Sequence, residues 1–220
     1  MVTTPVEQEA RMKIGILGAG MIGGTVGRLW AQAGHDVTFG VRHPERLRPM
    51  LAELGGKAGA SPAVDAVAGA DVVLAAIPFR AWPDVAAEIE AALGDKVLLD
   101  ATVPDPPRDG AFGDAALARK DGVAFAVAPL LPRAKLVRAF STVMWTTLRS
   151  QAHRAGDRIG IPLAGDDEEA VALAARLVVD AGFDPVVAGR LALARRFDPG
   201  TAVFDSGMSG PEVRAALGIA

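Results

Sequence analysis

A glycine-rich turn near the start of the chain constrains the fold more than any other feature of the sequence. The apolar run "MKIGIL" leads directly into "GAGMIGG", in which Gly18, Gly20 and Gly23 stand at the spacing G-x-G-x-x-G. Apolar residues at helical spacing follow in "GGTVGRLWAQA". A buried strand, a tight glycine turn and a helix, in that order, are typical of a dinucleotide-binding unit. The motif alone would be weak, because the chain has 25 glycines and a plain glycine turn is the alternative.

Each part of this turn has a physical role in holding a pyrophosphate. The first glycine permits the tight turn, the second lets the phosphates approach the backbone, and the third allows the helix to pack closely on the strand. The free amides and the partial positive charge at the helix N-terminus attract the phosphates. We therefore predict nucleotide contacts from the residues of the turn: Gly18, Ala19, Gly20, Met21, Ile22 and Gly23.

The end of the second expected strand indicates which dinucleotide binds. An NAD site places an acidic residue about 20 residues beyond the motif, where it binds the ribose 2′-hydroxyl. Here the segment reads "VTFGVRHPER", with Gly40 at the strand end and Arg42 and Arg46 after it. Because this segment lacks the carboxylate that would repel a 2′-phosphate and offers guanidinium groups to bind it, we predict NADP(H). The alternative for each arginine is a solvated surface side chain.

Short apolar runs alternate with amphipathic segments along the chain. Strands are expected at 12–17, 35–41, 71–77, 96–100, 134–140, 158–165 and 183–189, and helices at 23–33, 44–54, 84–93, 166–181 and 212–217. Continuously apolar strands separated by helices indicate a mostly parallel sheet covered on both faces, and hence a doubly wound α/β fold of the Rossmann type. The stretch "PDPP" at 104–107 is expected to end regular structure.

We expect three parts in the chain. Residues 1–11 form a flexible N-terminal extension, 12–140 form the NADP-binding Rossmann domain, and 141–220 form a small C-terminal lobe packed on that domain. The tail at 197–220 carries short helical segments and a glycine-rich turn, and the sequence assigns it no role.

Composition argues against several other classes of function. A net charge of −3 without a basic cluster argues against nucleic-acid binding. No apolar stretch reaches the ~18 residues of a membrane span, and the N-terminus lacks the apolar core of a secretory signal. The chain has no cysteine, which excludes thiolate metal sites and fits a cytoplasmic protein, and we expect no metal site. It has no tyrosine, which excludes the Tyr–Lys mechanism of many short-chain reductases.

The sequence resembles the F420-dependent NADP reductases. The likeness covers 12–196 and is carried by "MKIGILGAGMIGGTVGRLWAQAGHDVTFGVR", "DVVLAAIPFRAWPDV", "DKVLLDATVPD", "LPRAKLVRAFSTV" and "PLAGDDEEAVALAARLVVDAGFDPVVAGRLALAR". The resemblance implies a homodimer and hydride transfer between NADPH and a deazaflavin, with Arg42 and Arg46 on the 2′-phosphate. It further implies that strand-end residues line the nicotinamide: Ile77, Pro78, Phe79, Ala101 and Ala139.

Three departures from the family pattern bear on the second substrate. The family usually has asparagine where this chain has Ser141, and "TNP" where this chain has "TVP" at 102–104. The tail after Asp198 also differs from the family. The first two changes fall where the electron acceptor should bind, so we leave the acceptor open between F420 and a flavin. The prediction of NADP(H) as cofactor is not affected by them.

Hydride transfer between two bound heterocycles requires stacked rings and excluded water, and it needs no charged catalytic group. We therefore assign no catalytic acid or base and predict an acceptor pocket at Ser141, Thr142 and Trp145, with core packing as the alternative for the tryptophan. A second hypothesis is reduction of a ferric chelate or of a small carbonyl or imine. A carbonyl or imine would need a proton donor such as His153 or one of the two hydroxyls. A third is a non-catalytic redox sensor that binds NADP(H).

Overall fold

The structure is a computed structural model that describes residues 11–219 of the chain. The expected N-terminal extension at 1–11 lies outside the described residues except for Arg11, whose guanidinium pairs with Asp36.

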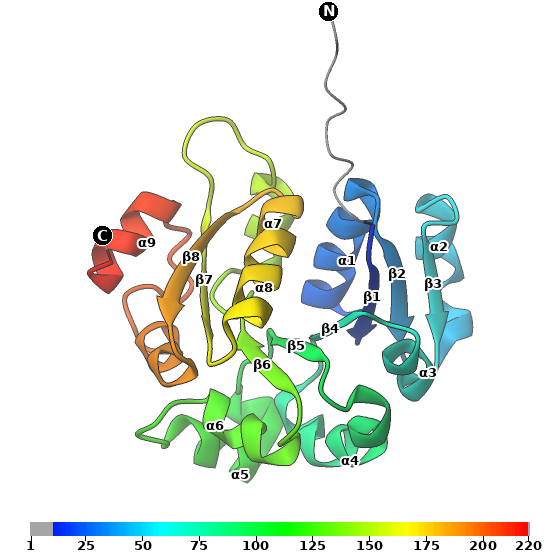
Figure 1. Ribbon diagram of the computed structural model, residues 1–220, viewed down its shortest axis with the longest axis horizontal. Helices are drawn as coiled ribbons and strands as arrows, with labels where there is room; N and C mark the ends of the chain where they lie inside the picture. The colour runs from blue at the N-terminus through cyan, green and yellow to red at the C-terminus, as the bar shows by residue number, and fades with distance from the viewer. Residues whose placement is uncertain (1–10, 220) are drawn as a thin grey trace, which may run out of the picture.

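Eight strands form one sheet in the order β3-β2-β1-β4-β5-β6-β7-β8 (Figure 1). The strands are β1 (Lys13–Leu17), β2 (Asp36–Gly40), β3 (Ala58–Ser61), β4 (Val72–Ala75), β5 (Val97–Asp100), β6 (Lys135–Arg138), β7 (Gly160–Gly165) and β8 (Asp184–Gly189). Strands β1 to β6 are parallel, β7 is antiparallel to β6, and β8 is parallel to β7. The strand order reverses between β1 and β4, which is where doubly wound sheets bind their ligands. The predicted fold class is confirmed.

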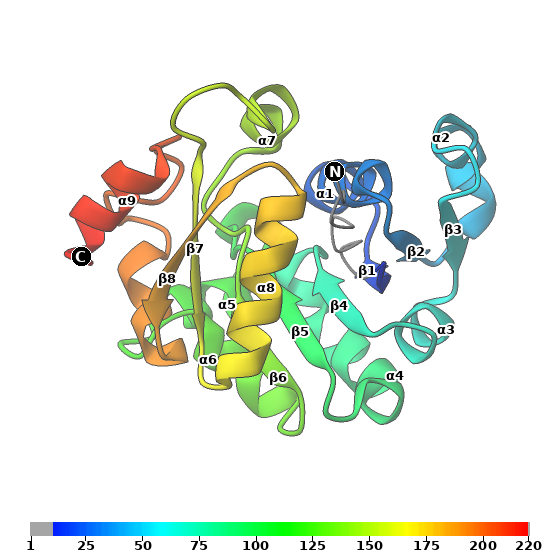
Figure 2. The ribbon, with the colours of Figure 1, turned by 45° about the horizontal axis from the view of Figure 1, so that its top comes forward.

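Helices cover both faces of this sheet (Figure 2). They are α1 (Met21–Ala33), α2 (Arg48–Glu53), α3 (Ala63–Ala68), α4 (Trp82–Leu93), α5 (Pro106–Leu117), α6 (Ala124–Val127), α7 (Trp145–Gln151), α8 (Glu168–Asp180) and α9 (Gly210–Leu217). Short 3₁₀ turns occur at η1 (Pro44–Leu47), η2 (Phe79–Ala81), η3 (Ala128–Leu130) and η4 (Leu191–Phe197).

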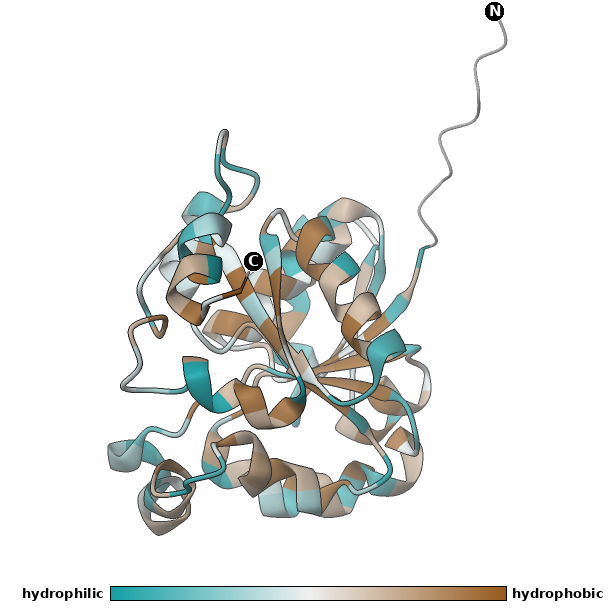
Figure 3. Cartoon of the chain, turned by 60° about the vertical axis from the view of Figure 1, so that its left-hand side comes forward, coloured by the Kyte–Doolittle hydropathy of each residue, from teal (hydrophilic) through white to brown (hydrophobic). Residues whose placement is uncertain are grey.

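The strands are predominantly apolar along their length (Figure 3), and their buried side chains belong to three hydrophobic clusters. In β5, for example, Leu99 packs with residues of α1, α7 and α8, whereas Leu98 packs with residues of α3, α4 and α6. Trp30 of α1 is fully buried and its indole N–H donates to the Leu177 carbonyl at 2.7 Å, which fixes α1 against α8. Burial on both faces explains why these strands read as continuous apolar runs.

Several elements differ from the expectation. The expected end of regular structure at 104–107 is wrong, because α5 begins at Pro106 and both prolines of "PP" occupy its first turn, where no intrahelical N–H is needed. Strand β3, "AGAS", and the short helices α3 and α7 were also not predicted. Strand β3 has no large apolar side chain and pairs only with β2 at the sheet edge, so it gives no periodic signal.

The C-terminal part continues the same sheet. After α7 the chain adds β7 and β8 beside β6, and α9 packs on that pair of strands. Helix α9 begins with a capping box in which Ser209 and Glu212 satisfy each other's backbone amides, and Arg214 forms a two-point ion pair with Asp184 of β8 at 2.8 Å. The domain boundary at 140 stays a prediction, and the sheet crosses it without interruption.

Candidate functional site

The glycine turn between β1 and α1 is built so that the first and third glycines are required by packing. Gly18 has φ +93°, and a Cβ there would lie 2.6 Å from the Ala76 carbonyl oxygen. A Cβ on Gly23 would lie 2.2 Å from the Gly18 carbonyl oxygen. Any side chain at either position would therefore force apart the strand, the turn and the helix.

The second glycine has the opposite environment. Gly20 caps α1 in an ordinary conformation, φ −74°, and a Cβ built on it would meet nothing within 4 Å. No side chain caps this helix, and its first turn holds no acidic residue. Within residues 11–219, no side chain therefore caps the first amides of α1, which suits the binding of a pyrophosphate. The turn fits the predicted cofactor.

A groove of about 580 Å³ extends from this turn along α1 and is also lined by residues of α2 and α7. Its lining residues are Ala19, Gly20, Met21, Gly24, Thr25, Arg28, Leu29, Gln32, Met50, Glu53, Trp145 and Arg149. The side chain of Trp145, the first residue of α7, therefore lies beside the glycine turn. Its predicted contact with the acceptor stays a prediction, and its position also suits contact with the cofactor.

Packing at the end of β2 explains why this strand does not end on the acidic residue of an NAD site. Gly40 is buried, and a Cβ there would meet Ala63 Cα and Ala66 Cβ at 3.1 Å, because α3 packs directly on it. A carboxylate has no room at this position. Arg42 and Arg46 follow in the exposed segment around η1, and within residues 11–219 neither forms an ion pair.

The loop after β4 holds three residues that are predicted to contact the nicotinamide, and these residues differ in their exposure. Ile77 is half-buried and Pro78 is exposed, so both can contact a ligand at the strand end. Phe79 is fully buried, and its ring packs on Phe112 of α5 with the ring centroids 5.3 Å apart. The Phe79 side chain therefore belongs to the core, and its predicted contact with the nicotinamide stays a prediction.

The next two strands end side by side. The amide of Ala101 donates to the Ala75 carbonyl at 3.0 Å, and the amide of Ala139 donates to the Asp100 carbonyl at 3.1 Å. These bonds extend the ladder by one residue beyond β5 and β6. Both alanines are buried, and their small side chains leave the edge of the sheet flat.

The segment after β6 carries strain and unpaired polar atoms. Phe140 has φ +57°, an uncommon conformation for a bulky residue, while its ring packs edge-on against Trp30. Ser141 and Thr142 follow, and the hydroxyl oxygen of each is buried without a hydrogen-bond partner among the described residues. The tail crosses this segment, where the amide of Asp205 donates to the Thr142 carbonyl at 2.8 Å. Buried polar atoms without partners are uncommon in folded proteins, and these two hydroxyls lie at the predicted acceptor pocket.

A buried ionic network lies under the ends of β5 and β6, and the sequence analysis missed it. Arg138 is fully buried and donates to Asp100 Oδ2 at 2.7 Å, while Asp100 Oδ1 accepts from the Thr102 hydroxyl at 2.6 Å. Trp82 of α4 donates to the same hydroxyl at 2.9 Å. One sequence signal was present: each of the apolar runs "VLLD" and "KLVR" ends on a charge.

Asp198 of the tail completes the network from the other side. Its Oδ1 lies 3.8 Å from Arg138 Nη2, and its Oδ2 accepts from the Val123 amide at 2.9 Å. Burial raises the pKa of Asp198, and the charge of Arg138 offsets part of that rise. The tail is thereby tied to the strands that carry the candidate site.

His153, the other proton donor considered from the sequence, is exposed in the loop after α7. Its amide donates to the Gly182 carbonyl at 3.0 Å. Among residues 11–219, no three metal-binding side chains cluster, and no helix has the length and hydropathy to cross a membrane.

The chain is similar to known proteins in part of its sequence and in its fold. Residues 13–104 match the family described as NADP oxidoreductase, coenzyme F420-dependent. The predicted family resemblance is confirmed. Comparison with curated protein sequences gives no significant match.

Solved structures with the same fold span nearly the whole chain. A hypothetical protein from Sinorhizobium meliloti is 25% identical with a TM-score of 0.76, and the alignment covers 92% of this chain and 96% of that one. A protein from Arthrobacter sp. FB24, provisionally described as an F420-dependent NADP reductase, is 25% identical with a TM-score of 0.69, covering 95% and 96%. An imine reductase from Pseudomonas sp. shares the fold at 20% identity and a TM-score of 0.61, covering 84% of this chain and 58% of that one. Family and fold together support an NADP-dependent oxidoreductase.

Proposed function

We propose that this protein transfers a hydride between NADPH, bound at the glycine turn, and a deazaflavin of the F420 class, bound against the segment 139–142. The observation that supports NADPH binding is the uncapped N-terminus of α1, where a Cβ on Gly20 would point into open space. The F420 acceptor is supported by the family match and by the similar Arthrobacter structure.

The residues of the chain would act by binding and positioning. The turn at 18–23 holds the pyrophosphate through backbone amides, and Arg42 and Arg46 bind the 2′-phosphate. Ala101 and Ala139 provide a flat floor at the strand ends, with Ile77 and Pro78 beside it. With both bound, the nicotinamide would supply the hydride, and the deazaflavin would take it up with one proton from solvent. The protein would need to align the rings and exclude water from between them.

A second candidate is reduction of a small imine or carbonyl compound. Such a reaction needs a proton donor near the carbon that receives the hydride. The buried, unpaired hydroxyls of Ser141 and Thr142 favour this candidate, and the fold is shared with imine reductases. The homodimer, the cytoplasmic location and a non-catalytic role as redox sensor stay predictions from the sequence.

An acceptor screen tests the proposal. NADPH and catalytic amounts of protein are mixed with F420, FMN, FAD, a ferric chelate or a cyclic imine, and loss of NADPH is followed. We expect many turnovers with F420 and one F420 reduced for each NADPH consumed. Turnover with the imine alone would favour the second candidate, and tight NADPH binding without turnover on any acceptor would favour the sensor. The Gly20→Ala variant, which should bind NADPH more weakly, serves as the control and should need more NADPH for the same rate.

A further inference from the structure

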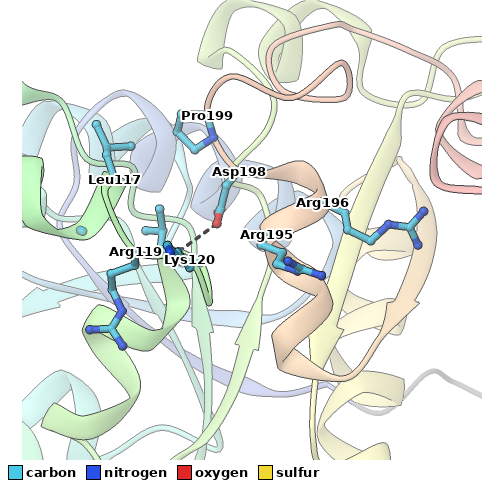
Figure 4. Close-up of a pocket in the computed structure, with 10 residues that line it drawn as sticks. Leu117, Arg119, Lys120, Arg195, Arg196, Asp198 and Pro199 are labelled. Carbon is cyan, nitrogen blue, oxygen red and sulfur yellow. Dashed lines mark hydrogen bonds between the residues drawn. The ribbon is translucent and has the colours of Figure 1, made fainter.

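A second hollow, of about 410 Å³, lies between the segments 116–123 and 195–199 (Figure 4). Two of its lining residues, Ala116 and Val123, belong to the core that α4 covers, whereas the buried residues of α1 belong to another core. We call this feature the basic hollow. Its lining residues are Ala116, Leu117, Arg119, Lys120, Gly122, Val123, Arg195, Arg196, Asp198 and Pro199.

Four cations from two distant segments surround this hollow in a chain whose net charge is −3. Figure 4 shows Arg119 and Lys120 on one side of Asp198, and Arg195 and Arg196 on the other. Bringing like charges together costs free energy unless a counter-charge offsets it.

Two of the four cations have partners. Arg119 donates through two nitrogens to Asp121, at 2.9 and 2.7 Å, and Arg196 donates to the Leu217 carbonyl. Within the described part of the chain, Lys120 and Arg195 form neither an ion pair nor a side-chain hydrogen bond. Two cations on opposite sides of the hollow are therefore available to a ligand.

Asp198 is the single acidic residue that lines the basic hollow, and its carboxylate already has partners. The Asp198 carboxylate accepts from the Val123 amide and faces the fully buried Arg138, with its Oδ1 3.8 Å from Nη2. Its negative charge is thus opposed from the interior, and burial raises its pKa. Asp198 consequently neutralises Lys120 and Arg195 very little.

The two segments are locked together at their closest approach. Gly122 has φ +102°, and a Cβ there would lie 3.0 Å from Arg195 Cβ and 3.1 Å from Asp198 Oδ2. Only glycine fits between them, and the bond from Val123 to Asp198 holds the loop in place. Lys120 and Arg195 therefore lie on two segments that pack together at Gly122, and this contact reduces the cost of binding a ligand between them.

We propose that the basic hollow binds a small polyanion carrying phosphate or carboxylate groups, at a site separate from the nucleotide. Its volume is within the usual range for small-molecule sites, about 300–1,000 Å³. Arg195 offers the planar fork that matches an oxyanion, and Lys120 adds a mobile point charge from the opposite side.

Isothermal titration calorimetry with inorganic pyrophosphate and with citrate tests this proposal. Saturating NADP⁺ is included, so that the glycine turn and Arg42 are not available to the probe. The variant Lys120→Gln/Arg195→Gln removes both unpaired charges, and Lys57→Gln/Arg133→Gln removes two exposed charges elsewhere as the matched control. All substituted side chains are exposed, so circular dichroism and thermal unfolding should be unchanged.

We expect one site in the natural protein, weakened by about tenfold or more in Lys120→Gln/Arg195→Gln and unchanged in the control. Tighter binding of pyrophosphate would identify a phosphate ligand, and tighter binding of citrate a polycarboxylate, and either supports the proposal. Equal binding by all three proteins, or no binding of either probe to the natural protein, would overturn it.

Discussion

Substituting alanine separately at the second and third glycines of the turn should separate ligand binding from packing. In Gly20→Ala the new methyl group meets no protein atom within 4 Å, and the backbone φ of −74° suits any residue. The methyl group instead occupies the space through which a phosphate would approach the first amides of α1. In Gly23→Ala the methyl group would lie 2.2 Å from the Gly18 carbonyl oxygen, well inside the 3.0 Å that Cβ atoms respect.

These distances give opposite expectations for the two variants. Gly20→Ala should leave the free energy of unfolding within about 0.5 kcal/mol of the natural protein. It should weaken NADPH about tenfold or more, because at least one charge-assisted amide bond is lost at about 1.5–3 kcal/mol. Gly23→Ala should lose about 1–3 kcal/mol of stability by overpacking. At roughly 2–4 °C per kcal/mol for a chain of this size, its Tm should fall by about 2–12 °C.

Fluorescence titration with NADPH and thermal unfolding measure both quantities on the same samples. Gly59→Ala in β3 is the control, since a Cβ there also meets nothing within 4 Å but lies away from the glycine turn. It should change neither quantity appreciably. If Gly20→Ala bound NADPH as tightly as the natural protein, the cradle assigned to the N-terminus of α1 would be refuted.

Three further changes test the rest of the structure. Ser209→Ala removes the capping box with Glu212 and should lower the free energy of unfolding by about 1 kcal/mol without affecting NADPH binding. An unchanged midpoint in denaturant unfolding would contradict the stabilising role of this cap. Arg138→Met leaves Asp100 buried without its cation and should cost about 3–5 kcal/mol, so a stable variant would show that the network contributes little. The pKa of Asp198 is raised above its ordinary 3.8, so stability falls as pH rises from that value through the folded pKa. The stability of Asp198→Asn relative to the natural protein should rise across that window, and a difference independent of pH would show that Asp198 does not titrate there.

Local pattern was sufficient to predict seven of the eight strands and the glycine turn between β1 and α1. The glycine spacing, the apolar runs and the absence of an acid at Gly40 are all read from neighbouring residues, and the structure adds their packing reasons. Helix α5 was missed because "PDPP" was interpreted as a break, whereas proline is tolerated in the first turn of a helix.

Contacts between distant segments could not be read in the same way. The network joins Asp100, Arg138 and Asp198, three residues far apart in the chain that meet only when β5, β6 and the tail are assembled. The prediction that Phe79 contacts the nicotinamide rests on its position after a strand end. The packing of its ring on Phe112 depends on α5, a helix that the sequence did not predict. The basic hollow depends on two loops meeting at Gly122 and has no local signature.

The central claim is that the turn and the end of β2 select NADPH, and equilibrium binding of NADPH and NADH to the natural protein and to Arg42→Ala tests it most directly. We expect the natural protein to prefer NADPH. In Arg42→Ala, NADPH should weaken by roughly 10- to 150-fold, from a lost charge-assisted contact of about 1.5–3 kcal/mol, while NADH should barely change. Arg133→Ala, another exposed arginine, should alter neither affinity. Equal loss of both nucleotides in Arg42→Ala, or no preference in the natural protein, would contradict the account.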